Sequence, residues 1–596
     1  MGEKTKTDVI KNKYKNVTST IKNQLQRVQL DAINTTEEIK YYPPRGTKIS
    51  WNEIKWKIVI QQVGNLQEKI VIATQKKDYK EVYRIQRAII TSFSGMALAV
   101  RKVVTNSGSK TAGIDKIKWK GSEDYTKAIS QLKEITANPG KYRAQPLKRV
   151  WIPKANSDEK RPLGIPTLID RAVQAVYHLA VDPVVECESD GNSYGFRKNR
   201  STHDAITAIR NHMDKRDHPR YILETDIRKC FDRINHEFLM KHTHICDKHV
   251  LEQWLKSGVM DKGTFQDTEA GTPQGGIISP VLCNIALNGI EKAIHRAFPL
   301  KKGISAGIHV IRYADDMITT GKSVEILKEA KNIIKEFLAD RGLELNENKT
   351  KITHVKEGFD FLGFNIVRKE YNPRLNSPTD QETVLIVKPS KKGVDNLKDK
   401  IKRIINKNNP IQQIVWMLNP ILRGWGEHKR ISYHSQETFI TIDHYIWTKM
   451  IKWTSRHAGS KRKAIARYII PSATRKWNWG KSQVDKLINL GEIPIIQLRP
   501  LKMERNPYLP EDKGYFQKRK EKLVLTKFKA AIYKLYKHIC PECGESLHNG
   551  ERIELHHILP KAKGGMKNKK DNIMPLHQIC HQQITRNMEE TTLNEI

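Results

Sequence analysis

The fold of this chain is decided by residues 309–320, which read His309-Val-Ile-Arg-Tyr313-Ala314-Asp315-Asp316-Met-Ile-Thr-Thr320. Their apolar and β-branched residues predict two strands joined by a tight turn that carries the paired carboxylates. A second stretch, Arg220-Tyr-Ile-Leu-Glu-Thr-Asp226, predicts a strand that ends on a carboxylate. We therefore expect a sheet that gathers Asp226, Asp315 and Asp316 at one point.

Aspartates from two neighbouring strands are the ligands that nucleotidyl transfer requires. That reaction uses two divalent metals about 4 Å apart, one on the attacking 3′-hydroxyl and one on the triphosphate. Magnesium prefers such oxygen ligands, and a bound cation relieves the repulsion between adjacent carboxylates. A lone Asp-Asp turn is more often a solvated turn, so the motifs around it decide between the two interpretations.

Further motifs stand in order on both sides of this turn. They are Ile152-Pro-Lys154, Lys160-Arg161-Pro-Leu-Gly-Ile-Pro166, Thr225-Asp226-Ile-Arg-Lys-Cys-Phe231-Asp232, Gly271-Thr-Pro-Gln274-Gly275-Gly276, Gly342-Leu-Glu-Leu-Asn346-Glu-Asn-Lys349 and Phe361-Leu-Gly363-Phe364. In this order they resemble the reverse transcriptases of group II introns over nearly all of residues 86–375. The resemblance implies an α+β right-hand polymerase, with fingers, a palm built on an antiparallel sheet, and an α-helical thumb.

The resemblance also implies how the metals are held. Asp226, Asp315 and Asp316 would bind two Mg²⁺ ions, and the backbone oxygen of Ile227 would assist them. These residues would therefore form the catalytic centre of the polymerase.

Four other residues match positions that bind substrate in similar polymerases. Lys154 and Arg161 would bind the triphosphate of the incoming dNTP, because cations neutralise charge at the transferring phosphate. Phe231 would block the 2′-hydroxyl of a ribonucleotide, which implies a DNA product, although core packing is the alternative. Gln274 lies in the turn that tracks template and primer, where glycines allow a close backbone approach.

The chain has 596 residues, with 105 Lys and Arg against 65 Asp and Glu, and a formal charge of +40. Such a charge repels itself unless an anion binds, and the usual partner is DNA or RNA. A merely soluble basic protein is the alternative on charge alone. The composition therefore favours a nucleic-acid partner.

The seven cysteines are not spaced like a disulfide framework. No apolar run is long enough to span a membrane, and the N-terminus Met1-Gly2-Glu3-Lys4 lacks an apolar signal core. We expect a protein that is neither secreted nor membrane-bound, in a bacterial cytoplasm or an organelle.

Residues 388–480 combine a strong excess of basic side chains with tryptophans. The segment Asn419-Pro-Ile-Leu-Arg423-Gly424-Trp425-Gly426-Glu-His428 resembles the thumb and maturase region of the same family, which implies binding of a folded intron RNA. Most of the tryptophans are expected to pack between helices rather than to stack on bases. They are Trp416, Trp425, Trp447, Trp453, Trp477 and Trp479. The run Lys461-Arg462-Lys463 fits RNA binding and a solvated face equally well.

The last 70 residues carry a pattern of zinc ligands. Cys540 and Cys543 form a two-residue knuckle, and a matching gap separates His577 from Cys580. A structural Zn²⁺ would stabilise a domain this small. Spacing leaves His581 open as the fourth ligand, but the matching gap favours His577.

Between these ligands, His556, His557, Asn572 and His581 resemble the motif of HNH endonucleases, whose domain has a ββα-metal fold. The resemblance implies that His557 acts as the base that activates a water and that Asn572 orients His557. It also implies that His556 and His581 hold a divalent metal. Many relatives have Asp at the place of His556, which leaves the metal's identity open. A zinc-stabilised nucleic-acid binder without cleavage is the alternative.

The predicted order is an N-terminal helical extension (1–85), fingers and palm (86–375), thumb and maturase region (376–480), a basic DNA-binding linker (481–525) and an HNH endonuclease (526–596). This order resembles that of group II intron-encoded proteins. The resemblance implies that intron RNA, target DNA and dNTPs are the partners. It also implies that a nick made by the HNH domain primes reverse transcription. A splicing cofactor with decayed enzymes and a retron-like reverse transcriptase are the alternatives, and the intact aspartates, maturase region and HNH residues argue against them.

Overall fold

The structure is a computed structural model. It describes residues 49–596 except for 154–158, 215–218, 300–306, 371–382, 407–408, 471–477, 484, 524–526, 560–565, 567–569 and 594–596. Contacts between residues divide the chain into two compact units. The larger unit comprises Val63–Lys120 and Lys127–Ala530, and the smaller comprises Met1–Gln62, Gly121–Thr126 and Ala531–Ile596.

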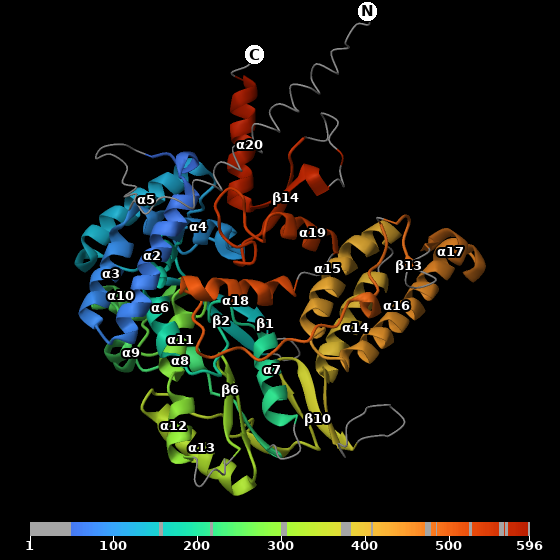
Figure 1. The fold of residues 1–596 in the computed structure, drawn as a ribbon, viewed down its shortest axis with the longest axis horizontal. Coiled ribbons are helices and arrows are strands. Elements are labelled where there is room, and N and C mark those ends of the chain that lie inside the picture. The colour runs from blue at the N-terminus through green and yellow to red at the C-terminus, as the bar shows by residue number, and fades with distance from the viewer. Residues whose placement is uncertain are drawn as a thin grey trace, which may run out of the picture. The chain divides into compact units, whose positions relative to one another are not determined.

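An antiparallel sheet of four strands, here called the catalytic sheet, lies in the larger unit (Figure 1). Its order is β6 (His309–Tyr313), β7 (Asp316–Gly321), β3 (Tyr221–Thr225) and β8 (Lys351–His354). The helices α7 (Thr202–Met213) and α13 (Val324–Ala339) contact it. The three strands predicted around the aspartates are therefore confirmed.

A second four-stranded sheet takes two strands from before β3 in the chain and two from after it. Its order is β2 (Lys160–Ile165), β1 (Leu147–Pro153), β4 (Val259–Asp261) and β5 (Thr264–Gln266). Because β1 and β2 pair antiparallel from Lys148 with Ile165 to Pro153 with Lys160, the two motifs predicted to bind the triphosphate form one hairpin.

The helix α6 (Leu168–Glu188) is the centre of the helical part, and most of its side chains are buried. It contacts α3, α4 and α11. The remaining helices before the catalytic turn are η1 (Trp51–Glu53), α2 (Trp56–Gln75), α3 (Tyr79–Thr91), α4 (Phe93–Thr105), η2 (Ser107–Lys110), α5 (Ser122–Ala137), η3 (Pro139–Lys141), α8 (Cys230–Arg233), α9 (His236–His242), α10 (Lys248–Leu255), α11 (Ser279–Leu287) and α12 (Ile290–Ala297). Among the described residues no single helix is long and apolar enough to cross a membrane; α3 and α4 pass that test only as a pair bent by 68°.

A three-stranded sheet and a helical bundle follow. The sheet has the order β11 (Thr383–Pro389), β10 (Phe364–Glu370) and β9 (Phe359–Phe361). The bundle contains α14 (Lys391–Asn406), α15 (Ile411–Lys429), α16 (Ser435–Ala458) and α17 (Lys461–Tyr468), followed by β12 (Ile469–Ile470), β13 (Asn478–Trp479) and η5 (Leu490–Glu492). Its apolar core includes Leu490 and Ile493, so the bundle continues beyond the boundary expected at residue 480.

The stretch expected to be a linker, 481–525, is folded onto its neighbours. Its first part completes the bundle core, and its second part forms α18 (Pro510–Glu521). Leu501 and Phe516 belong to the same apolar cluster as Ile222 and Ile318 of the catalytic sheet. The prolines of this stretch, Pro494, Pro500, Pro507 and Pro510, favour a linker by composition, but buried side chains anchor it to the rest of the larger unit.

The smaller unit contains the C-terminal domain. Its elements are β14 (Ile553–His557), η7 (Lys570–Asn572), β15 (Ile573–His577) and α20 (Gln578–Leu593), and α19 (Lys527–Leu535) precedes them. The two strands pair antiparallel from Ile553 with His577 to His557 with Ile573. From α20, the side chain of Gln583 donates hydrogen bonds to the carbonyls of Asn52 and Ile54, at 3.1 and 3.3 Å.

Candidate active sites

The hairpin of β6 and β7 carries the paired carboxylates. Tyr313 at the end of β6 pairs with Asp316 at the start of β7, and Ala314 between them has a φ of 58°. This left-handed conformation is costly for alanine, but it gives the tight turn that carries Asp315. The neighbouring strand β3 runs antiparallel to β7 and ends one residue before Asp226, so all three predicted metal ligands lie at one end of the sheet.

The three carboxylates disfavour each other's charge. Burial, together with the charges of Asp315 and Asp226, raises the pKa of Asp316 to about 6. Burial also raises the pKa of Asp315, with the charge of Asp226 adding to the effect. A divalent cation would offset both causes. The donor set therefore fits oxygen-liganded metal ions such as Mg²⁺.

The backbone after Asp226 is held by the motif that contains Asn346. The Nδ2 of Asn346 donates to Oδ2 of Asp226 at 2.9 Å, and its backbone N–H donates to the Asp226 carbonyl at 2.8 Å. Lys349 Nζ lies 3.6 Å from the same Asp226 oxygen. Ile227, whose carbonyl is a predicted metal ligand, forms an antiparallel bridge with Leu345. Asn346 and Lys349 belong to the motif at residues 342–349 that resembles the family. In the structure, the side chains of both lie near the carboxylate of Asp226.

Of the two cations predicted to bind the triphosphate, Lys154 lies outside the described residues. Arg161 is exposed on β2, and its charge lowers the pKa of Asp315 against the larger effect of burial. Arg161 is thus within electrostatic reach of the paired carboxylates, as expected of a triphosphate ligand.

The predicted template–primer turn contacts both β2 of the second sheet and the helix α8. The carbonyl of Gln274 accepts a hydrogen bond from the N–H of Gly164 at 2.8 Å. Its side chain donates to Oδ1 of Asp232 at 3.1 Å. Gly275 has a φ of 120°, which favours glycine.

Phe231 lies half-buried in α8 beside this turn. Its carbonyl accepts a hydrogen bond from the N–H of Thr272 at 2.6 Å. Its ring meets the ring of Phe196 edge to face, with centroids 6.1 Å apart. Phe196 cannot be predicted as part of the site from sequence, because a lone phenylalanine in a loop gives no signal of its own.

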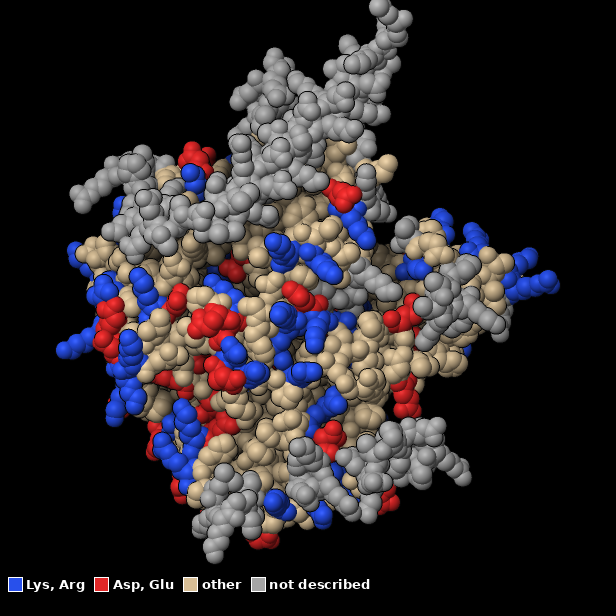
Figure 2. All heavy atoms as spheres, in the orientation of Figure 1, with Lys and Arg blue, Asp and Glu red and all other residues tan. Residues whose placement is uncertain are grey.

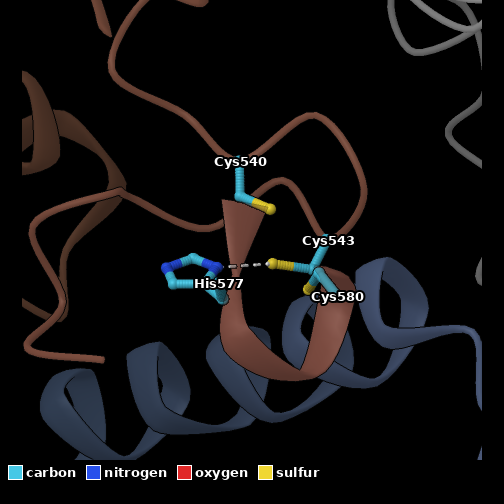
Figure 3. A group of neighbouring side chains, drawn as sticks. All are labelled: Cys540, Cys543, His577 and Cys580. Carbon is cyan, nitrogen blue, oxygen red and sulfur yellow. Dashed lines mark hydrogen bonds between the residues drawn. The ribbon is translucent and has the colours of Figure 1, made fainter. Parts of the chain in front are cut away.

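In the smaller unit, four side chains that could bind zinc converge, here called the zinc cluster (Figure 3). One ligand atom from each of Cys540, Cys543, His577 and Cys580 lies within 4.8 Å of the others, and all four residues are buried. The Nδ1 of His577 is 3.3 Å from Sγ of Cys543. Hydrogen bonds with Cys543 and Cys580 lower the pKa of Cys540. Three thiols and an imidazole in this arrangement fit a tetrahedral Zn²⁺.

The histidine that spacing left open has other contacts. His581 Nδ1 lies 2.7 Å from Oε2 of Glu554, and its ring lies 5.1 Å from that of His556. The geometry therefore supports His577 in the zinc cluster. Glu554 stands two residues before His556, on the same face of β14, and this alternation could have drawn attention to it.

His556 has the properties of an available metal ligand. Its Nε2 is buried and has no hydrogen-bond partner among the described residues. Burial, together with the nearby His581 and His557, lowers its pKa to about 4, so the imidazole is neutral at physiological pH. Glu554, His556, His557 and His581, here called the HNH cluster, thus carry imidazole nitrogens and a carboxylate, which are donor types that divalent metals accept.

Asn572 holds the backbone of the loop after His557. Its Oδ1 accepts from the N–H of Leu559 at 2.7 Å, and its Nδ2 donates to the carbonyls of Leu559 and Met566 at 3.1 and 3.3 Å. Its own carbonyl accepts from Ile558 at 3.0 Å. Asn572 therefore acts on the position of His557 through the backbone that follows it.

The tryptophans of the basic region separate into two groups. Trp453 and Trp479 are buried, and Trp425 and Trp447 pack against the bundle core, as expected; Trp477 lies outside the described residues. Trp416 differs, with 77% of its surface exposed. Figure 2 shows exposed Lys and Arg side chains at the outer end of α16 and on α17. This surface suits a polyanion.

Comparisons with known proteins agree with both sites. Four family models match: the N-terminal domain of reverse transcriptase (residues 51–132), reverse transcriptase or RNA-dependent DNA polymerase (152–366), the group II intron maturase-specific domain (394–469) and HNH endonuclease (540–587).

The chain is also similar to curated proteins from bacteria and yeast. It is 32% identical to Protein YkfC of Escherichia coli over 48% of this chain and 84% of the relative. It is 27% identical to the group II intron-encoded protein LtrA of Lactococcus lactis, over 62% of this chain and 74% of the relative. A putative COX1/OXI3 intron 1 protein of Saccharomyces cerevisiae is 31% identical over 41% of this chain and 35% of the relative. Together with the catalytic sheet and the zinc cluster, these matches show that the chain belongs to the group II intron-encoded proteins that combine a reverse transcriptase, a maturase and an HNH endonuclease.

Proposed function

We propose that this reverse transcriptase and endonuclease copies intron RNA into DNA from a nick that its own HNH domain makes. Intron RNA, bound at the maturase region, would be inserted into one strand of a DNA target. The HNH domain would nick the other strand, and the polymerase would extend the new 3′-hydroxyl with dNTPs. The four matching domains in one chain support this sequence of steps.

At the polymerase site, Asp226, Asp315 and Asp316 would hold two Mg²⁺ ions, with the carbonyl of Ile227 as a further ligand. When bound, these ions lower the pKa of the 3′-hydroxyl and neutralise charge on the triphosphate. Asn346 fixes the rotamer of Asp226 through its 2.9 Å hydrogen bond. The chain's own part in this reaction is to hold three carboxylates at one end of a rigid sheet.

Substrate binding would involve the predicted cations and the residues around α8. Arg161 and Lys154 would bind the triphosphate. Gln274 would keep the template–primer turn against Asp232, to which it donates. Phe231 would exclude ribonucleotides through contact with the sugar.

At the nuclease site, His557 would take the proton from the attacking water. His556 and His581 would hold one divalent metal, which neutralises charge on the phosphodiester when bound. The orphaned, buried Nε2 of His556 supports this role. Asn572 would orient His557 indirectly, through the loop that its side chain fixes. Zn²⁺ in the zinc cluster would be structural.

The architecture supports a right-hand polymerase. The second sheet would form the fingers, the catalytic sheet the palm (both within 86–375), and α14–α17 the thumb and maturase region (376–480, with its core continuing to Ile493). The exposed lysines of α18 suit the predicted DNA binding of residues 481–525. The N-terminal extension (1–85) and a ββα-metal HNH domain (526–596) complete the proposal. Relatives in bacteria and in yeast introns support a bacterial cytoplasm or an organelle.

The observation that carries the proposal is that Asp226, Asp315 and Asp316 lie at one end of the catalytic sheet, in a chain that also matches an HNH endonuclease. The test is to mix purified protein, intron RNA, dNTPs, Mg²⁺ and end-labelled target DNA. We expect cDNA joined covalently to the nicked strand. cDNA that is never joined to target DNA would contradict the coupling of the two activities.

A further inference from the structure

Residues 192–197 form a short segment along the edge of the catalytic sheet. The N–H of Arg312 in β6 donates to the carbonyl of Asn192, and the N–H of Tyr194 donates to the carbonyl of Arg312, both at 2.9 Å. Ser193 forms a parallel bridge with Arg312. The segment therefore runs beside β6 toward the turn that carries the catalytic aspartates.

Gly195 brings this segment into contact with the catalytic turn. A Cβ at Gly195 would lie 2.2 Å from the backbone nitrogen of Ala314, so no side chain fits there. Buried Asn284 donates to the Gly195 carbonyl at 3.0 Å, and its own Oδ1 accepts from Arg312 at 3.0 Å. Gly195 is thus fixed to the backbone beside Asp315.

Arg197 anchors the other end of the segment. Its guanidinium makes two hydrogen bonds of 2.8 Å to the carboxylate of Glu186, and it donates to the carbonyls of Asp190 and Ser193 at 2.7 Å. Arg197 and Glu186 are both buried. Such a bidentate, charge-assisted contact leaves the chain little freedom.

Phe196, between Gly195 and Arg197, has both an unfavourable backbone conformation and an exposed apolar ring. Its φ is 60°, in the left-handed region that bulky side chains avoid, and its side chain is 46% exposed. Surroundings that force both conditions on one residue are typical of a functional site. The contact that the ring makes in return is the edge-to-face contact with Phe231.

On its other side, Phe231 contacts the template–primer turn through its backbone. Thr272 donates to its carbonyl, and a Cβ at Gly271 would lie 2.7 Å from that same oxygen. These contacts fix the main chain of Phe231. Within the described residues, Phe196 is the aromatic side chain that contacts the ring.

We propose that Phe196 is a positioning residue that fixes the ring of Phe231, and thereby sets how strongly the polymerase prefers dNTPs over rNTPs. This inference rests on the proposed role of Phe231. If the ring of Phe231 could rotate, it would move aside for a ribose 2′-hydroxyl. If Phe196 holds that ring in place, the ring excludes the 2′-hydroxyl. Because the segment is also fixed to Ala314, the distance between this aromatic pair and the catalytic turn is constrained by the fold.

The test compares incorporation of dCTP and CTP opposite guanine in an RNA template by the full-length protein. Phe196→Gly removes the ring, and glycine tolerates the backbone conformation, so the variant should fold. We expect its ratio of kcat/KM for dCTP over CTP to fall about tenfold, a fraction of the discrimination a steric contact can supply. Phe196→Tyr keeps a ring and should retain the wild-type ratio. Phe196→Leu, which keeps bulk without a ring, should give a ratio between those of the wild type and Phe196→Gly.

Three further variants make the result decisive. Phe265→Ala removes an aromatic side chain of matched exposure, 48%, from β5 and should leave the ratio unchanged. Phe231→Ala should lower the ratio more than any Phe196 variant, and adding Phe196→Gly to it should have no further effect. An unchanged ratio in Phe196→Gly and Phe196→Leu, while Phe231→Ala lowers it, would overturn this inference alone. An unchanged ratio in Phe231→Ala would overturn the proposed role of Phe231 as well.

Discussion

The two catalytic regions of this protein are held together in different ways. The catalytic sheet has four paired strands, and its side chains join an apolar cluster that also includes Phe364 and Phe516. The HNH region has one two-stranded hairpin and one helix, with a buried group of three thiols and an imidazole beside them. The polymerase site is therefore organised by hydrophobic burial, whereas we expect the nuclease region to need a bound metal for its fold.

The largest expected effect is the loss of the zinc cluster. Cys543→Ser should remove bound zinc and unfold the HNH domain, because a domain of this kind relies on a metal-binding free energy on the order of 10 kcal/mol. Nicking should disappear while cDNA synthesis on a primed RNA template continues. Zinc content by mass spectrometry and both activities measure this, with Cys246→Ser, outside the cluster, as the control. Nicking that survives full loss of zinc would contradict the expectation that the HNH domain needs the metal to fold.

A smaller effect is expected from a support of the polymerase site. Asn346→Ala removes the side-chain hydrogen bond that orients Asp226, and losing such a partner of a metal ligand typically costs roughly 10- to 100-fold in activity. We expect cDNA synthesis to slow by roughly 10- to 100-fold, with the melting temperature nearly unchanged. Steady-state kinetics would reveal it. If Asn346→Ala unfolded the protein instead, the sheet would not be as self-sufficient as its core suggests.

Tyr508 tests whether residues 499–523 belong to the polymerase fold. Its buried hydroxyl donates a hydrogen bond to the carboxylate of buried Asp182. Tyr508→Phe leaves that carboxylate without this donor, which should cost about 1–3 kcal/mol of unfolding free energy. Urea denaturation measures the loss. Tyr433→Phe, an exposed tyrosine, should change nothing, and equal stability of both variants would restore the linker interpretation.

The smallest effect concerns pH. Burial, with Lys429 and His203 nearby, lowers the pKa of His428 from 6.5 to about 4. The unfolded chain therefore binds a proton that the folded chain does not, and stability falls as pH drops from about 6.5 to 4, then levels off below that. His428→Asn should lose less stability than the wild type between pH 7 and pH 5. Urea midpoints at the two pH values compare them, and parallel losses would assign the effect to other groups.

The sequence was informative where a local pattern carries the geometry. Alternation and the paired aspartates predicted β3, β6 and β7, and the matching gaps favoured His577 over His581. It was silent where contacts join distant segments. Phe196 and Phe231 lie 35 residues apart and meet through separate loops, and the prolines of 481–525 concealed buried anchors such as Tyr508. In the sequence, Glu554 is only one of many acidic residues. Its role follows from its contact with His581, which joins β14 to α20.

We propose that two independent sites of this protein act in order on one DNA target. The most direct test compares wild type, Asp315→Asn and His557→Ala with intron RNA, dNTPs, Mg²⁺ and labelled target DNA, either intact or already nicked. We expect Asp315→Asn to nick intact DNA without making cDNA. His557→Ala should make cDNA on nicked DNA and none on intact DNA. Loss of both activities in either variant, or cDNA from intact DNA in His557→Ala, would contradict the proposal that separate sites nick the DNA and then extend the nick.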